Sequence, residues 1–440
     1  MMKSDNLKIS LFVTAVFFAV SALAQPYDCS DGRFREFDKY QVEALATDVK
    51  YSDTKNRDGN PQSLYLDVFG PSGDGLAQRP LVLVFHGGSF MSGSRQDVEA
   101  SARMFASLGY VTSTVSYRLG INILDGILGT LDSAVAAEAV AMATQDINTA
   151  VRWFRKGAAE DGNPYNINPE MIFAIGFSAG AFMCNFSQYM NTEERIPDLI
   201  DMTKPGLADG GISSNSTDRD DYSFELKAVA SYAGAIYDTL WMDENSTPNA
   251  MFHAVDDDVV PYSHDVISVL EIPLLHVHGG YSMQLRASHA GMKHCWHQWQ
   301  GDEGGGHINL TPQGEAVSAN ITRNLFGHFV CGVVLECDGS APMPTELDPS
   351  MTALDQESAE KPVRLIGIYH AGDRSLSVDL GRFANSHAEV TVYGPDGKIM
   401  HAARVNLGIY TFHPEDLCPG AYLIRVSNGI RSETVKVVVK

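Results

Sequence analysis

Hydrophobic and polar positions follow two different periods along the first three quarters of the chain. Residues 63–69 alternate as a half-buried strand does, and residues 81–85 form a continuous apolar run, which is typical of a strand covered on both faces. Residues 98–108 follow with helical periodicity, and residues 171–175 form another short apolar run. This alternation of strands and helices predicts an α/β domain with a mostly parallel central sheet and helices on both faces.

The pattern changes near residue 339. Residues 339–361 are acidic, contain prolines and lack hydrophobic periodicity, which predicts a linker. Residues 362–440 carry only short strand signals, with a turn at Pro395-Asp396-Gly397, and predict a small β-sandwich. The strands expected there are residues 363–369, 375–380, 388–393, 421–426 and 434–439.

The N-terminus has the three parts of a signal peptide. Lys3 and Lys8 precede an apolar run over residues 9–20, and Ala22-Leu23-Ala24 forms a small-x-small cleavage site. A transmembrane anchor would need a longer apolar span. We therefore expect residues 1–24 to be removed and residues 25–338 to form the α/β domain of an exported protein with no membrane span after cleavage.

Charge and cysteine content narrow the function classes. The formal charge of −22 over 440 residues argues against nucleic acid or an anionic membrane as partner, since both need basic patches. The six cysteines show no spacing typical of a zinc site, and their pairing cannot be read from the sequence. Cys331 and Cys337 are close enough to close a small loop, whereas Cys184 is expected to be a buried thiol.

The segment Gly176-Phe177-Ser178-Ala179-Gly180 follows the apolar run at residues 171–175. A bare G-x-S-x-G pattern is weak evidence, but here a predicted strand precedes it and small, helix-compatible residues follow. The chain must reverse direction at Ser178, and the two glycines leave out side chains that would collide where strand and helix pass closely. This is a nucleophile elbow, and the chain here resembles the α/β-hydrolase superfamily, in particular its carboxylesterase and lipase-like branch.

Two further motifs carry the same resemblance. His86-Gly87-Gly88-Ser89-Phe90 resembles the H-G-G-G loop of esterases and lipases, with serine in place of the last glycine. The resemblance implies that the N–H groups of Gly88, Ser89 and Ala179 form an oxyanion hole. The segment from His253 to Pro261 resembles the H-G-x-x-D-x-x-V-P turn of the superfamily.

That turn implies that Asp257 is the acid of a catalytic triad, with Asp256 and Asp258 as solvated loop residues and His253 as a structural residue. His307 follows three glycines after the last predicted strand, at residues 295–300, and takes the place of the triad histidine. The order Ser178, Asp257, His307 is that of α/β-hydrolases.

Two assignments concern the residues between these motifs. Tyr117 and Arg118 are expected to be structural, and Asp146 lies too early in the chain for the triad acid. Residues 121–142 begin with a strongly apolar stretch that either caps the pocket or packs as an ordinary amphipathic helix, and the sequence does not separate the two.

The last part of the β-sandwich, from Cys418-Pro419-Gly420 to Lys440, resembles the C-terminal sorting domain of the type IX secretion system of Bacteroidetes. The resemblance implies an interaction with that secretion machinery and delivery to the cell surface or medium. A carbohydrate-binding or adhesive module is the alternative.

These observations together predict an exported serine esterase that acts on carboxylic esters, including acetyl or feruloyl esters of polysaccharides, through an acyl-enzyme. No cofactor or metal is expected. Two alternatives stay open: a prolyl-oligopeptidase-like serine peptidase, which shares the sheet and the triad order, and a surface binding protein whose hydrolase body is inert.

Overall fold

The computed structural model describes residues 27–208, 222–269 and 271–348, and in the C-terminal part residues 366–370, 375–379, 387–395, 398–406, 409–413, 418–427 and 432–439. The predicted signal peptide, at residues 1–24, lies outside the described residues. The chain divides into two compact units, Met1–Ala353 and Leu354–Lys440, which are described separately.

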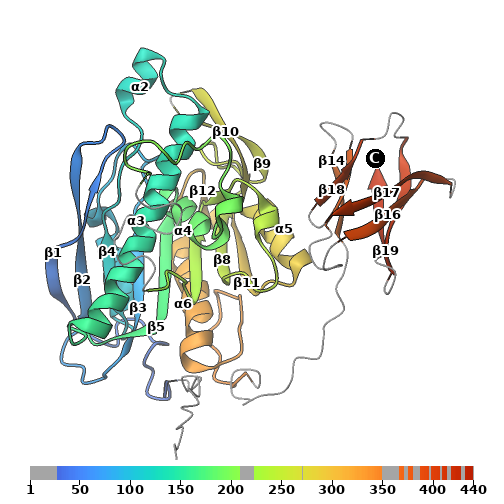
Figure 1. The fold of residues 1–440 in the computed structure, drawn as a ribbon. Coiled ribbons are helices and arrows are strands. Elements are labelled where there is room, and N and C mark those ends of the chain that lie inside the picture. The colour runs from blue at the N-terminus through green and yellow to red at the C-terminus, as the bar shows by residue number, and fades with distance from the viewer. Residues whose placement is uncertain are drawn as a thin grey trace, which may run out of the picture. The chain divides into compact units, whose positions relative to one another are not determined.

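An eight-stranded sheet forms the centre of the first unit (Figure 1). Its strand order is β1 (Val42–Lys55), β2 (Pro61–Pro71), β4 (Val111–Val115), β3 (Arg79–Phe85), β5 (Ile167–Phe177), β6 (Ala228–Tyr232), β8 (Asn249–Ala254) and β11 (His294–Trp299). The β1–β2 and β2–β4 pairs are antiparallel, and every pair from β4 to β11 is parallel. The continuous apolar run at residues 81–85 lies in β3, which is buried along its whole length, as its composition predicts.

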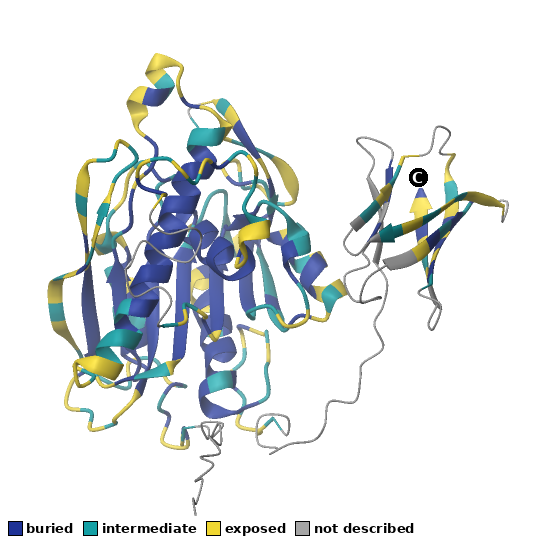
Figure 2. Ribbon diagram, viewed as in Figure 1, coloured by how far each residue is buried: buried dark blue, intermediate teal, exposed yellow. Residues whose placement is uncertain are grey.

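Helices cover both faces of this sheet, and Figure 2 shows the buried strands between them. The helices are α1 (Glu99–Ala106), α2 (Ile123–Leu128), α3 (Ser133–Glu160), α4 (Ala179–Tyr189), α5 (Gly280–Ala290) and α6 (Pro312–Cys331). One core cluster joins Leu81 and Leu83 to α3, α4 and α5, while the other joins Val82 and Val84 to α1 and α6. Successive side chains of β3 thus enter opposite cores, because strand side chains alternate between the faces of a sheet.

Short strands complete the unit outside the main sheet. They are β7 (Ala235–Ile236), β9 (His264–Val269) and β10 (Ile272–Gly279), which pair in the order β7-β10-β9, and the pair β12 (Gly304–Gly305) and β13 (Asn309–Leu310). The β9–β10 hairpin was not predicted from the sequence.

Two disulfides tie the ends of this unit together. Cys29 bonds to Cys331 and Cys295 bonds to Cys337, so the small loop between Cys331 and Cys337 considered above does not form. The reason is spatial: the N-terminal segment lies beside the end of α6, where the Tyr27 N–H donates to the Val330 carbonyl, whereas the chain after α6 returns to β11. Cys184 is a buried free thiol, as expected, and burial raises its pKa.

The predicted linker starts later along the chain than residue 339. The Asn320 side chain donates to the Gly339 carbonyl over 2.9 Å, and Met343 is buried against Gly327. Val333 and Leu347 form an antiparallel bridge. The acidic composition of this stretch hid these contacts, because they use one apolar side chain, that of Met343, and backbone groups. Residues 349–361 lie outside the described residues.

The second unit consists of two antiparallel sheets, as expected for a β-sandwich. One has the order β14 (Ile366–His370), β15 (Ser375–Asp379), β18 (Ile409–Phe412), and the other β17 (Ile399–Asn406), β16 (His387–Tyr393), β19 (Gly420–Ser427), β20 (Ser432–Val439). Side chains of β15, β16, β19 and β20 share one core. The strands β17 and β18 were not predicted.

Within the described parts of the chain, no helix is long and apolar enough to cross a membrane.

Candidate active site

Ser178 lies between β5 and α4, at the carboxyl edge of the parallel strands. Its φ of +52° and ψ of −117° are unusual for a residue with a side chain, and its N–H donates to the Tyr232 carbonyl over 2.8 Å. A Cβ on Gly176 would lie 2.4 Å from the Gly180 carbonyl oxygen, and one on Gly180 would lie 2.5 Å from the Phe85 carbonyl oxygen. The steric role predicted for both glycines is therefore confirmed.

The structure brings the three predicted triad residues together. His307, between β12 and β13, has its Nε2 2.7 Å from Ser178 Oγ. Its Nδ1 lies 3.0 Å from Asp257 Oδ2 and 3.2 Å from Oδ1. One imidazole ring thus connects a hydroxyl to a buried carboxylate, which is the geometry of nucleophile, base and orienting acid.

The Asp257 carboxylate is buried and lies within reach of four donors. The backbone N–H groups of Val259 and Val260 both donate to Oδ1 over 2.9 Å, while His253 and His307 reach the carboxylate from the other side. Burial alone would raise the pKa of Asp257, but the hydrogen bonds from His253, His307 and Val260 outweigh it and hold the pKa well below its ordinary value. The carboxylate therefore stays ionised beside His307.

The two neighbouring aspartates differ from one another. Asp258 is exposed, as expected of a solvated loop residue. Asp256 is exposed too, but its Oδ1 accepts a 2.9 Å hydrogen bond from the Gly306 N–H, immediately before His307. Asp256 is thus an exposed loop acid, as expected, with an additional contact that the sequence did not predict, because the fold brings Gly306 to it from 50 residues away.

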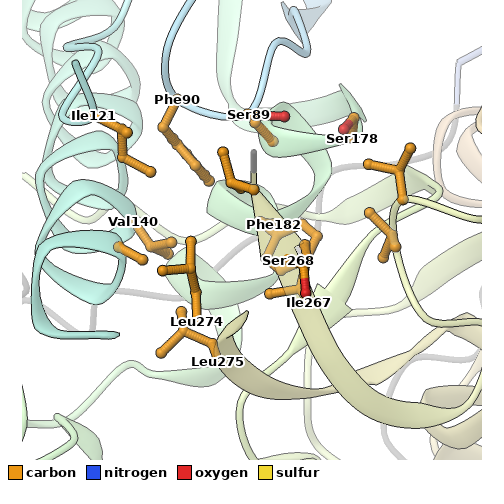
Figure 3. Close-up of a pocket in the computed structure, with 15 residues that line it drawn as sticks. Ser89, Phe90, Ile121, Val140, Ser178, Phe182, Ile267, Ser268, Leu274 and Leu275 are labelled. Carbon is orange, nitrogen blue, oxygen red and sulfur yellow. The ribbon is translucent and has the colours of Figure 1, made fainter. Parts of the chain in front are cut away.

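The loop from His86 to Phe90 lies beside the elbow. A Cβ on Gly87 would lie 3.1 Å from the Ser178 Cβ, and Gly88 has a φ of +112°. Ser89, which stands where the H-G-G-G loop has its third glycine, also has a positive φ of +53°. Ser89 lines the same pocket as Ser178 and Ala179, and Figure 3 shows the Ser89 and Ser178 side chains near one another. Ala179 is the first residue of α4, so its N–H has no acceptor within the helix.

Tyr117 supports this loop from behind. Its ring stacks on His86 with centroids 4.3 Å apart, and its hydroxyl donates to the His86 carbonyl over 2.8 Å. Burial lowers the pKa of His86, and the ring is hydrogen-bonded to the Gly87 carbonyl through Nδ1. The structural role expected for Tyr117 agrees with these contacts.

Arg118 and Asp146 form a buried ion pair away from the triad. The Arg118 guanidinium lies 2.8 Å from an Asp146 oxygen, and the Arg118 N–H donates to the same carboxylate over 2.8 Å. Both side chains are almost completely buried. The Asp146 carboxylate therefore pairs with Arg118 and not with His307, which agrees with its exclusion as the triad acid.

An apolar pocket adjoins Ser178 (Figure 3). The β9–β10 hairpin contributes Ile267, Leu274 and Leu275 to it, and Ile121 and Val140 come from the segment whose role the sequence left open. No residue of the intervening helix α2 is among those that line the pocket, and its large side chains are exposed; they are Ile123, Leu124, Ile127 and Leu128. The hairpin is the part of the site that sequence reasoning missed, and the alternation of apolar and polar residues in Leu275-His276-Val277-His278 was a signal for it.

Among the described residues, no group of three or more His, Cys, Asp or Glu side chains is placed to hold a metal ion.

A match to a known family covers the part of the chain that contains Ser178 and Asp257. Residues 66–268, from β2 to β9, match the BD-FAE family, a family of α/β-hydrolase esterases. The parallel sheet order, the elbow between β5 and α4 and this match decide the fold. The first unit has the α/β-hydrolase fold. The predicted fold class is confirmed.

The individual proteins that this chain resembles are distant from it in sequence. A 125-residue stretch is 33% identical to neuroligin-like protein glit-1 of Caenorhabditis elegans, and the match covers 28% of this chain and 15% of that protein. Among solved structures, Thermogutta terrifontis esterase 2 phosphorylated by paraoxon is similar over 65% of this chain and 93% of its own, with 18% identity and a TM-score of 0.42. The propionate-bound form of the esterase from that planctomycete is similar over 66% of this chain and 93% of its own, with 18% identity and a TM-score of 0.41.

Proposed function

We propose that this α/β-hydrolase is a serine esterase that hydrolyses carboxylic esters through an acyl-enzyme. The observation that carries the proposal is the placement of the His307 ring, with Nε2 2.7 Å from Ser178 Oγ and Nδ1 3.0 Å from Asp257 Oδ2. The match of residues 66–268 to an esterase family supports ester rather than amide chemistry.

The first half of the reaction forms the acyl-enzyme. Ser178 Oγ attacks the ester carbonyl while His307 Nε2 takes its proton, and Asp257 stabilises the resulting imidazolium. The carbonyl oxygen becomes an oxyanion, for which we propose the N–H groups of Gly88, Ser89 and Ala179 as donors. His307 then returns the proton to the leaving alkoxide, and the alcohol departs.

Water completes the cycle by the same steps in reverse. His307 takes a proton from a water molecule as its oxygen attacks the acyl carbon, and Ser178 leaves with that proton. The product is a carboxylic acid, and no cofactor enters the reaction.

The pocket supports an apolar acyl group, since aliphatic and aromatic side chains form its wall next to Ser178. Acetyl or feruloyl esters of polysaccharides are the substrates that we propose for an exported enzyme of this kind. Export through the type IX machinery rests on the resemblance of the C-terminal unit, and the two disulfides support an oxidising compartment.

Two measurements on the full chain test the proposal. The protein is incubated with p-nitrophenyl acetate and with aminoacyl anilides, and a fluorophosphonate probe is mapped by peptide mass spectrometry. We expect ester hydrolysis and a single adduct on Ser178, with neither in Ser178→Ala. Preference for anilides would favour a peptidase, and a folded protein that neither hydrolyses nor labels would favour a binding protein.

A further inference from the structure

His253 is a buried histidine that the mechanism above does not use. It lies on β8 and has no exposed surface. Its Nε2 lies 3.0 Å from the Val260 carbonyl oxygen and 3.2 Å from Asp257 Oδ2. Its Nδ1 accepts a 3.1 Å hydrogen bond from the Gly280 N–H. Both ring nitrogens are therefore held by neighbours, Nε2 by the turn at residues 257–260 and Nδ1 by Gly280.

These neighbours determine which nitrogen carries the proton. A backbone N–H such as that of Gly280 can only donate, so Nδ1 is the acceptor. The Val260 carbonyl and the ionised Asp257 carboxylate can only accept, so the proton is on Nε2. The ring is thus a neutral donor whose single Nε2–H lies between two acceptors, the Val260 carbonyl at 3.0 Å and the Asp257 carboxylate at 3.2 Å. This tautomer is the reverse of the one that His307 needs when its Nε2 accepts from Ser178.

We propose that His253 is a positioning residue of the triad, whose Nε2–H holds the Asp257 carboxylate in the orientation that receives His307. This inference rests on the proposed esterase function. Val259 and Val260 fix Oδ1 from the loop side, and His253 fixes Oδ2 from the strand side. With both oxygens held, the carboxylate cannot rotate away from the His307 Nδ1.

The packing around the ring supports this role. A Cβ on Gly280 would lie 3.0 Å from His253 Nδ1, so the first residue of α5 approaches the ring as closely as a glycine allows. The edge of the Tyr262 ring contacts the other side, with centroids 5.9 Å apart. The ring therefore has one position, and the direction of its Nε2–H is fixed by β8 rather than by the exposed loop.

The test compares three variants of the full chain with p-nitrophenyl acetate as substrate. His253→Phe keeps a ring but loses the donor, and we expect kcat to fall roughly 10- to 100-fold with KM changed less than about twofold. His253→Gln places an amide N–H near the former Nε2 and should restore part of kcat. His328→Phe is the matched control, because His328 is equally buried but lies on α6 and bonds to Val333.

A double-mutant cycle separates positioning from stability. If His253 acts through Asp257, then adding His253→Phe to Asp257→Asn should cost no further kcat, whereas a stability effect would reduce activity again. A further loss of tenfold or more in the Asp257→Asn background would overturn the proposal. So would a kcat for His253→Phe equal to that of His328→Phe.

A second readout needs no turnover and keeps the inference separate from the proposed function. The proton that His307 Nδ1 shares with Asp257 gives a low-field resonance in a one-dimensional proton spectrum. We expect this resonance to shift or broaden in His253→Phe and to stay in place in His328→Phe. An unchanged resonance would overturn the inference even if the protein hydrolysed no ester.

Discussion

At the residue scale, three consecutive aspartates have three different environments. Asp257 is buried and receives hydrogen bonds from two backbone N–H groups and two histidines, whereas Asp258 is exposed. Asp257→Asn should lower kcat by roughly 10⁴ because the amide disturbs the tautomer of His307. Asp258→Asn should stay within about twofold of wild type. Steady-state kinetics on p-nitrophenyl acetate checks both, and a sensitive Asp258 would contradict the assigned turn.

Asp256 provides a finer test, because it holds the histidine loop through one hydrogen bond. Asp256→Asn keeps an oxygen acceptor for the Gly306 N–H, so kcat should remain near wild type. Asp256→Ala removes the acceptor from an exposed site and should lower kcat by about 3- to 10-fold. The same kinetic assay compares the two variants. Equal activity of Asn and Ala would mean that the bond to Gly306 does not position His307.

At the scale of elements, the β9–β10 hairpin forms one wall of the pocket beside Ser178. Leu275 on β10 is buried and lines the pocket, so Leu275→Ala should enlarge it and raise kcat/KM for hexanoyl relative to acetyl esters. The substitution should also destabilise the fold by about 2–5 kcal/mol. Acyl-chain profiles with a series of p-nitrophenyl esters measure the first effect.

Leu325→Ala is the control for this change. Leu325 is buried in the core between the sheet and α6 and does not line the pocket, so its loss should lower stability without altering the acyl-chain profile. An unchanged profile in Leu275→Ala would mean that the hairpin does not contact the acyl chain.

At the scale of the whole molecule, pH acts on folding through buried histidines. Burial lowers the pKa of His86, so the unfolded chain binds a proton near pH 6.5 that the folded chain does not. The unfolded state then holds more protons, and the free energy of unfolding decreases as pH falls from about 6.5 towards the folded pKa. Asp257 does not contribute there, because its carboxyl takes up a proton in the unfolded chain only at about pH 4, and in the folded chain only in stronger acid.

His86→Asn tests this dependence, since its amide keeps a donor near Nδ1 for the Gly87 carbonyl but cannot titrate. Urea unfolding midpoints at pH 7, 6 and 5 should fall less steeply in the variant than in wild type. Parallel slopes would show that His86 is not a source of the pH dependence.

The boundary of the catalytic unit gives the last prediction. Asn320, Gly327 and Val333 hold residues 339–347, so a chain ending at Asp348 should keep the melting temperature and esterase activity of this unit. A chain ending at Asp338 should melt several degrees lower, because it lacks Met343 and exposes the apolar surface that this side chain covers. In a native host, the chain ending at Asp348 should also accumulate in the periplasm if the C-terminal unit directs export. Normal surface delivery would contradict that sorting role.

The sequence by itself determined whatever is encoded locally. The buried β3 follows from one apolar run. The elbow follows from two glycines: Gly176 lies against Gly180, four residues later, and Gly180 lies against the end of the adjoining strand β3. Ser178 and the triad order could be predicted for this reason, because motif spacing records a turn of the backbone directly.

Only the tertiary structure decided the contacts between distant segments. Cys29 meets Cys331 across 302 residues, Asp256 meets Gly306 across 50, and the β9–β10 hairpin meets α3 over the pocket. His253 is four residues from Asp257, yet its role depends on Gly280, which fixes the proton on the far nitrogen. Such contacts depend on how the elements pack in space, and neither periodicity nor motif spacing carries that information.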